Sequence, residues 1–159
     1  MPKLSAGIKE LPKRVNIVVF PEDYFVIYLP IGIKAISGEW FRPATTRFAV
    51  VIQEPKTVTM IIPRRKWLRM QRLFDRYEVE GPVKVISFDV KLALVSSGYL
   101  STLGSLLTES GIRSTPISSF RKDHVIVPKE DLPRAVRILR NFLAGNKGSA
   151  GGESKKSAK

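Results

Sequence analysis

Few residues of this chain have the chemistry of an enzyme active site. The 159-residue sequence contains no cysteine and one histidine, His124. The missing cysteines remove disulfides, thiolate metal sites and cysteine nucleophiles, and a Ser–His–Asp hydrolase would have to use His124 as its base. His124 lies in segment 123–127, which has the pattern of a β-strand, and the sequence has no nucleophile elbow. We therefore predict a protein that is not an enzyme and that uses no metal or cofactor.

A row of arginines is the second chemical signal. Arg65, Arg69, Arg72 and Arg76 recur at a spacing that places them along one face of a helix over residues 64–76. The opposite face is apolar and consists of Trp67, Met70, Phe74 and Tyr77. A basic face of this kind is usually only solvated, but it could also make salt-sensitive contacts with nucleic-acid phosphates. No recognition-helix, RNA-binding-sheet or zinc-finger signature accompanies it.

The charge and composition indicate a soluble protein with a basic surface. The formal net charge is +13, of which the Gly/Ser/Lys-rich tail over 145–159 contributes +3. That tail has no apolar period, so we expect it to be disordered. No apolar run is long enough for a membrane span, and the N-terminus lacks the apolar core of a secretory signal. We expect a cytoplasmic location.

The first half of the chain is predicted to consist mostly of strands, which Pro63 ends. Strands are predicted over 15–20 and 24–29, separated by a turn at 21–23. A hairpin is predicted from 48–52 and 57–62 around Glu54–Pro55–Lys56. The glycine-punctuated segment 31–42 between them is irregular, with Trp40–Phe41 as its anchor in the core.

The second half alternates strands and helices. Over 85–95 the even positions are apolar, which is typical of a strand buried on one face. Ser96–Ser97–Gly98 interrupts this pattern with helix-capping hydroxyls and a residue without a Cβ. A helix then follows, which Gly111 ends as the left-handed C′ residue. An edge strand containing Pro116 comes next.

A strand over 123–127 and a helix that opens near Glu130 complete this half. The order β-α-β-β-α is the core of a ferredoxin-like split βαβ unit. The predicted fold class is therefore α+β.

Several short segments of the second half then resemble, in order and spacing, the ACT domains that bind amino acids, including those of cytosolic arginine sensors. These segments are Glu80–Gly81–Pro82, Ser97–Gly98, Glu109–Ser110–Gly111–Ile112, Ile117–Ser118–Ser119–Phe120 and Asp123–His124–Val125–Ile126–Val127–Pro128–Lys129–Glu130–Asp131–Leu132. The resemblance implies two tandem ACT-type repeats with antiparallel sheets, of which the first is degenerate. The predicted organisation is a lead-in over 1–13, a degenerate repeat over 14–63, a basic connecting helix over 64–77, an ACT domain over 78–144 and the tail over 145–159.

The resemblance also implies a ligand site between ACT modules, formed by the loop before the helix and the β-hairpin. Carried over to this sequence, its residues are Ser97, Gly98, Ser119, Phe120 and Asp123. Free N–H groups at the start of the helix would hold a carboxylate, and Asp123 would pair with an ammonium group. Arg121, Lys122 and His124 around Asp123 depart from the small or polar residues and the tyrosine that the family usually has there.

Three functions follow from these residues. The leading prediction is a non-enzymatic sensor that binds an amino acid or a similar small ligand between ACT modules and forms a homodimer or higher homo-oligomer. The second is a nucleic-acid-associated protein that uses the basic helix 64–76. The third is an enzyme acting on an acidic or phosphorylated small molecule, for which the sequence offers no catalytic constellation.

Overall fold

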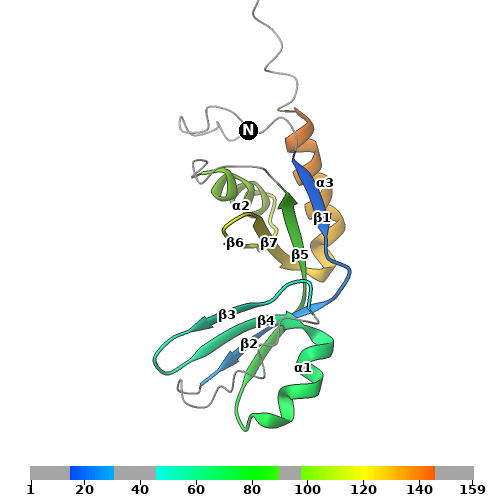
Figure 1. Ribbon diagram of the computed structural model, residues 1–159. Helices are drawn as coiled ribbons and strands as arrows, with labels where there is room; N and C mark the ends of the chain where they lie inside the picture. Colours follow the sequence, from blue (N-terminus) through cyan, green and yellow to red (C-terminus); the bar gives the residue numbers. More distant parts are fainter. Residues whose placement is uncertain (1–14, 31–45, 90–97, 146–159) are drawn as a thin grey trace, which may run out of the picture. The chain divides into compact units, whose positions relative to one another are not determined.

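The computed structural model describes residues 15–30, 46–89 and 98–145 (Figure 1). The strands are β1 (Asn16–Val19), β2 (Tyr24–Leu29), β3 (Val50–Gln53), β4 (Val58–Pro63), β5 (Glu78–Asp89), β6 (Thr115–Ser118) and β7 (Asp123–Pro128). The helices are α1 (Arg64–Met70), α2 (Tyr99–Glu109) and α3 (Leu132–Gly145), with the 3₁₀ turns η4 (Gln71–Leu73) and η5 (Lys129–Asp131). In the described ranges, no helix has the length and apolarity that a membrane span requires.

The chain divides into two compact units, and these do not follow the predicted boundaries. The first unit consists of Val19–Val85 with Pro128–Glu130. The described part of the second unit consists of 15–18, 86–89, 98–127 and 131–145. Strand β1 thus belongs to the second unit, while α1, predicted as a connector, packs within the first. The physical reason is that β1 pairs with β5, whereas α1 contacts β2 and β4.

The sheet of the first unit has the order β3-β4-β2-β5. The predicted hairpin is confirmed, because β3 pairs with β4 in antiparallel register from Val50↔Ile61 to Gln53↔Val58. Strand β2 also pairs antiparallel with both β4 and the first part of β5. One cluster of apolar side chains forms the core between this sheet and α1. It consists of Ile27, Leu29, Val58, Met60, Ile62, Trp67, Met70 and Phe74.

Helix α1 is shorter than predicted. The α-helix begins at Arg64 and ends at Met70, η4 extends it to Leu73, and Phe74 is already extended. The prediction of a helix to residue 76 or 77 is therefore wrong at its C-terminal end. The apolar side chains that suggested a longer helix are instead held by ring packing, since Trp67 stacks on Phe74 at 5.8 Å and meets Tyr77 edge-on at 4.9 Å.

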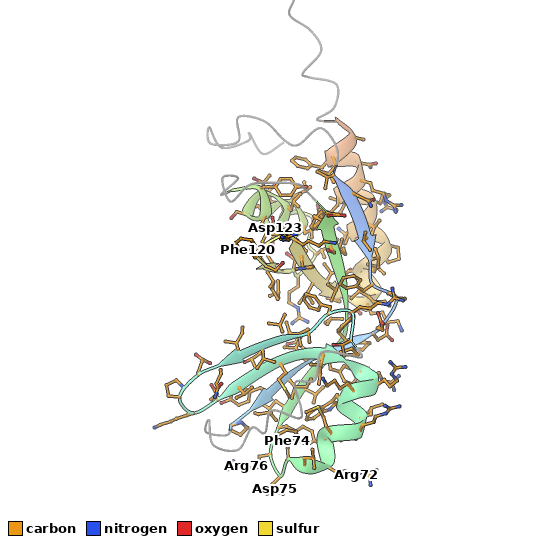
Figure 2. All side chains as sticks on the ribbon, in the orientation of Figure 1. Arg72, Phe74, Asp75, Arg76, Phe120 and Asp123 are labelled. Atoms are coloured by element: carbon orange, nitrogen blue, oxygen red, sulfur yellow. The ribbon has the colours of Figure 1, made fainter. Side chains whose placement is uncertain are left out.

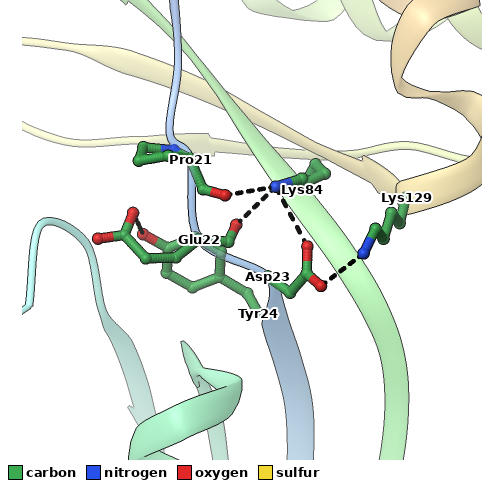
Figure 3. Close-up of polar contacts among 6 residues, drawn as sticks. All are labelled: Pro21, Glu22, Asp23, Tyr24, Lys84 and Lys129. Carbon is green, nitrogen blue, oxygen red and sulfur yellow. Dashed lines mark hydrogen bonds and ion pairs between the residues drawn. The ribbon is translucent and has the colours of Figure 1, made fainter.

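A polar cluster closes the turn before β2 onto β5 (Figure 3). The buried Lys84 donates to the carbonyl oxygens of Pro21 at 2.7 Å and Glu22 at 3.1 Å, and its Nζ lies 3.1 Å from Asp23 Oδ1. Lys129 Nζ lies 2.7 Å from the other carboxylate oxygen of Asp23. The hydrogen bond from Lys129 is the main cause that lowers the pKa of Asp23, and Lys84 adds to it against the effect of desolvation. A buried lysine is tolerated here because each of its contacts is polar.

The sheet of the second unit has the order β6-β7-β5-β1. Strand β6, which contains Pro116, lies at the edge as predicted, and it pairs antiparallel with β7 from Thr115↔Ile126 to Ser118↔Asp123. Helix α2 packs against α3 and β6. Its C-terminus is the predicted left-handed cap: Gly111 has φ +74°, its N–H donates to Thr108 O, and the Ile112 N–H donates to Leu107 O.

Strand β5 is more buried than the alternating pattern predicted. Every residue from Val83 to Phe88 is buried, including Val85 and Ser87 on the face that was predicted to be polar. The strand also begins at Glu78 rather than near residue 85. The prediction of a strand buried on one face is therefore wrong for 83–88. Burial of successive residues means that both faces of the strand are covered by packed side chains, which a sequence period does not reveal.

The two units have the same topology. In the first, with the sheet order β3-β4-β2-β5, the strands β2, β3 and β4 take the first three places of the repeat and β5 takes the fourth. In the second, β5, β6 and β7 take the first three places and β1 takes the fourth. The prediction of an α+β fold with two ferredoxin-like repeats and antiparallel sheets is confirmed. Each repeat has a complete set of four strands because β5 serves in both.

Candidate functional site

The first part of the predicted ligand site is the start of α2. Gly98 is the N-cap residue of this helix, with φ +123°, a conformation that L side chains rarely adopt. No side chain among the described residues caps the helix there. Ser97, the other residue predicted in this loop, lies outside the described residues, as does Ser96.

The second part of the predicted site is the hairpin between β6 and β7. Ser118 and Asp123 are opposite each other at its end, and Ser118 Oγ donates to Asp123 Oδ1 at 2.7 Å. Ser119 closes the turn, since its N–H and its Oγ both donate to Lys122 O, at 2.9 and 2.8 Å. The hairpin thus fixes the Asp123 carboxylate from one side, while the hydroxyl of Ser119 is occupied within the turn.

Tyr99, at the start of α2, was not among the predicted site residues. It is the first residue of α2, its side chain is 1% exposed, and its ring packs edge-on against Phe88 of β5 at 6.2 Å. Burial raises the pKa of the Tyr99 hydroxyl, and the Asp123 carboxylate raises it further. The phenol therefore stays protonated at neutral pH and lies within the electrostatic field of Asp123. The sequence signal that could have pointed to Tyr99 is a hydroxyl-bearing aromatic residue directly after Gly98.

Asp123 is flanked in the sequence by two residues with titratable side chains, Lys122 and His124. Lys122 Nζ lies 3.8 Å from Asp89 Oδ1, at the end of β5. His124 is buried on β7, and burial lowers the pKa of its imidazole, an effect that Asp123 opposes and Lys122 reinforces. His124 is therefore neutral at neutral pH. Lys122, the cationic residue next to Asp123 in the sequence, forms an ion pair with Asp89. The Asp123 carboxylate instead accepts a hydrogen bond from Ser118.

Figure 2 shows where the two labelled residues of the hairpin lie. Phe120 is at the tip of the turn and is 80% exposed. Asp123 begins β7 and is half-buried. Gly98 and Tyr99 at the start of α2 and Ser118 and Asp123 of the hairpin thus all belong to the second unit, and the Phe120 ring lies in solvent.

The basic residues of the alternative prediction do not form one helical face. Arg65 and Arg69 are exposed on α1, Arg72 is in η4, and Arg76 follows the end of both. Figure 2 shows Arg72 and Arg76 near the C-terminal end of α1. Leu68, which is 45% exposed, lies on the same face as Arg65 and Arg72. The exposed face of α1 is thus mixed apolar and basic rather than purely basic as predicted.

Among the residues that the structure describes, no group of His, Asp and Glu side chains has the arrangement of a metal site. The two sheets, each of four strands in the same order, place the chain in the class of α+β proteins built from paired ferredoxin-like repeats.

Comparison with known proteins identifies one domain of the chain. Residues 78–141, from β5 into α3, match the model of the ACT domain. None of the curated proteins matches the chain significantly.

Solved structures share the fold over most of the chain. A protein of unknown function from Vibrio cholerae, described as a possible transport protein, has a TM-score of 0.64 at 20% identity, covering 87% of this chain and 99% of its own. A protein from Agrobacterium tumefaciens has a TM-score of 0.63 at 18% identity, covering 84% and 90%. The regulatory subunit of aspartate kinase from Thermus flavus has a TM-score of 0.58 at 11% identity, covering 79% and 95%. At these identities the similarity concerns the fold.

Proposed function

We propose that this protein is a non-enzymatic sensor that binds a free amino acid through the region around Gly98 and Asp123. The observation that carries the proposal is the position of Asp123. Its carboxylate accepts a hydrogen bond from Ser118 at the start of β7, in the same unit as the start of α2, which no described side chain caps. A carboxylate and a set of free N–H groups complement the two charges of an amino acid.

Three further facts support this function. The second unit carries the ACT domain, and structures with the same fold include regulatory subunits of aspartate kinase. The start of α2 favours an anion because its free N–H groups and the helix dipole both present positive charge there. The proposal includes an interface between ACT modules as the place of binding, self-association through those modules and a cytoplasmic location.

The test is thermal unfolding with each of the common L-amino acids in turn. An amino acid present at a hundred times its Kd should stabilise the folded protein by about 2.7 kcal/mol. We expect Asp123→Asn to abolish this shift, because the neutral amide cannot form an ion pair with the ammonium group. Sedimentation with and without that amino acid would test self-association.

The matched control is Asp75→Asn, which removes a carboxylate that is exposed in the first unit. This variant should retain the full shift. The proposal is wrong if no amino acid raises the midpoint of the wild-type protein, or if Asp123→Asn responds as the wild type does.

The alternative of nucleic-acid binding does not enter the proposed function. It relied on one continuous basic face over residues 64–76. With α1 ending at Met70 and Leu68 exposed between the arginines, no specific observation favours phosphate contacts over simple solvation of these side chains.

A further inference from the structure

The positive charge of the first unit is concentrated on α1, η4 and the residues directly after them. Segment 64–77 contains five arginines and one lysine against a single carboxylate, Asp75. The other described residues of the unit contain four cations and six carboxylates. The exposed side chains of 64–77, which we call the α1–η4 surface, are therefore strongly basic, whereas the remainder of the unit is slightly acidic.

The cations of the α1–η4 surface have no counter-charges in the part of the chain that the structure describes. None of them forms an ion pair there, and Arg64 lies over the ring of Phe25 at 6.0 Å. Elsewhere in the same unit, Arg47, Lys84 and Lys129 each pair with a carboxylate. Clustered like charges repel one another and destabilise the folded state, so an external negative charge would stabilise this surface.

Three large apolar or aromatic side chains are exposed among these cations. Leu68 is 45% exposed, Leu73 is 60% exposed and Tyr77 is 42% exposed. The core under the helix is formed by other side chains of the same segment, namely Trp67 and Met70. Exposed apolar side chains with a polar rim are typical of interaction sites. Solvation alone accounts for the arginines but gives no reason for two leucines between them.

We propose that the α1–η4 surface docks on an anionic membrane surface. Negatively charged headgroups attract its arginines, while Leu68, Leu73 and the ring of Tyr77 lie at the boundary between the headgroups and the acyl chains. The contact is peripheral, and it is independent of the proposed amino-acid binding in the second unit. It requires no pocket, because a fluid bilayer adapts to the convex surface of a helix.

Other anionic partners fit this surface less well. A nucleic acid would attract the arginines through its backbone but would leave Leu68 and Leu73 in water. A protein interface usually depends on a few anchor residues that cluster at its centre, whereas the apolar side chains here are spread between the cations along the segment. The combination of charge and dispersed apolar side chains therefore favours a bilayer.

The test is co-sedimentation of the full chain with phosphatidylcholine vesicles that contain about one third phosphatidylglycerol, or none. We expect the wild-type protein to bind only the anionic vesicles, and less as the salt concentration rises. The double variant Arg65→Gln/Arg72→Gln should bind them about 25-fold more weakly, because each cation close to an anionic surface strengthens binding about fivefold.

Two further double variants separate this surface from the net charge of the protein. Arg137→Gln/Arg140→Gln removes the same charge from exposed positions of α3 in the second unit, and it should bind nearly as the wild type does. Leu68→Ser/Leu73→Ser keeps every charge and should weaken binding by about tenfold, because the apolar side chains no longer leave water. All of these side chains are exposed or lie at the surface, so the unfolding temperatures should stay near that of the wild type.

Four results would overturn the inference. The first is no binding of the wild-type protein to anionic vesicles at low salt, which would leave an acidic protein as the partner of this surface. The second is an equal loss in the two arginine variants, because net charge alone would then explain the binding. The third is wild-type binding by Leu68→Ser/Leu73→Ser. The fourth is binding to a short DNA duplex in preference to the vesicles, weakened in Arg65→Gln/Arg72→Gln alone, which would assign the surface to nucleic acid.

Discussion

At the scale of single residues, two glycines of α2 illustrate opposite requirements. Gly111 is the C′ residue of the helix with φ +74°, although a Cβ there would meet nothing within 4 Å. Gly104 is buried within the helix, and a Cβ there would lie 3.7 Å from Pro116 Cγ, an ordinary van der Waals contact. Gly111 is therefore needed for its backbone conformation, whereas Gly104 has neither a conformational nor a steric requirement.

The prediction is that alanine at these two positions changes stability in opposite directions. Gly111→Ala should lower the free energy of unfolding by about 1–2 kcal/mol, because a Cβ is unfavourable in the left-handed region. Gly104→Ala should raise it by about 0.5–1 kcal/mol, the usual difference between glycine and alanine inside a helix. Urea denaturation of both variants measures the two changes. A loss at Gly104 would show that α2 and β6 pack too closely for a methyl group.

At the scale of elements, the polar cluster of Asp23, Lys84 and Lys129 ties the turn before β2 to β5 and to η5. The cluster makes the stability of the first unit depend on the ionisation of Asp23. Its lysines lower the pKa of this carboxyl below its ordinary value of 3.8. The contribution of the carboxylate is therefore complete above that value and is lost as the pH falls through the lower pKa of the folded state.

We expect Asp23→Asn to lower the free energy of unfolding at neutral pH by about 1–2 kcal/mol, because Lys84 stays buried without its counter-charge. The difference between wild type and variant should shrink as the pH falls below 3.8. Urea denaturation at a series of pH values measures it, with the exposed Asp75→Asn as the control that should show little difference at any pH. A difference that is independent of pH would mean that the charge of Asp23 is not what stabilises the cluster.

At the scale of the whole molecule, each of the two repeats contains strands that come from distant parts of the sequence. Strand β1 supplies the fourth strand of the second unit, although the rest of that unit begins more than sixty residues later at Ile86. Strand β5 supplies its first part to one sheet and its last part to the other. Neither unit is therefore a continuous segment of the chain.

This arrangement predicts that a defect near the N-terminus weakens the second unit. Ile17 is half-buried on β1, whereas its neighbour Val18 is 38% exposed. Ile17→Asp should increase hydrogen exchange in the last part of β5 and in β7, because a charge on the buried side disrupts the pairing of β1. Protection in β2 and β4 should change little.

Val18→Asp is the matched control, since it places the same charge on the more exposed side of the same strand. It should leave the exchange of β5 and β7 near that of the wild type. Faster exchange in β2 and β4 than in β7 after Ile17→Asp would contradict the assignment of β1 to the second unit.

The sequence by itself determined the local structure of this protein. The apolar patterns of 24–29, 57–62 and 123–127 predicted strands that the structure contains, Gly111 predicted the end of α2, and Pro116 predicted an edge strand. The α+β class followed from these elements, and the resemblance of short segments in the second half indicated an ACT domain. Such features depend on neighbours within a few residues, through backbone conformation, capping and alternation, and a sequence displays those neighbours directly.

Only the tertiary structure decided which distant segments share a sheet and which side chains meet. It assigned β1 to the second unit, buried both faces of β5 over 83–88, and ended α1 at Met70. It also buried Tyr99 and placed Phe120 in solvent. These outcomes depend on pairing and packing between residues far apart in the chain, for which the local pattern carries no signal. For this reason the sequence indicated Gly98 and Asp123, and the structure was needed to add Tyr99.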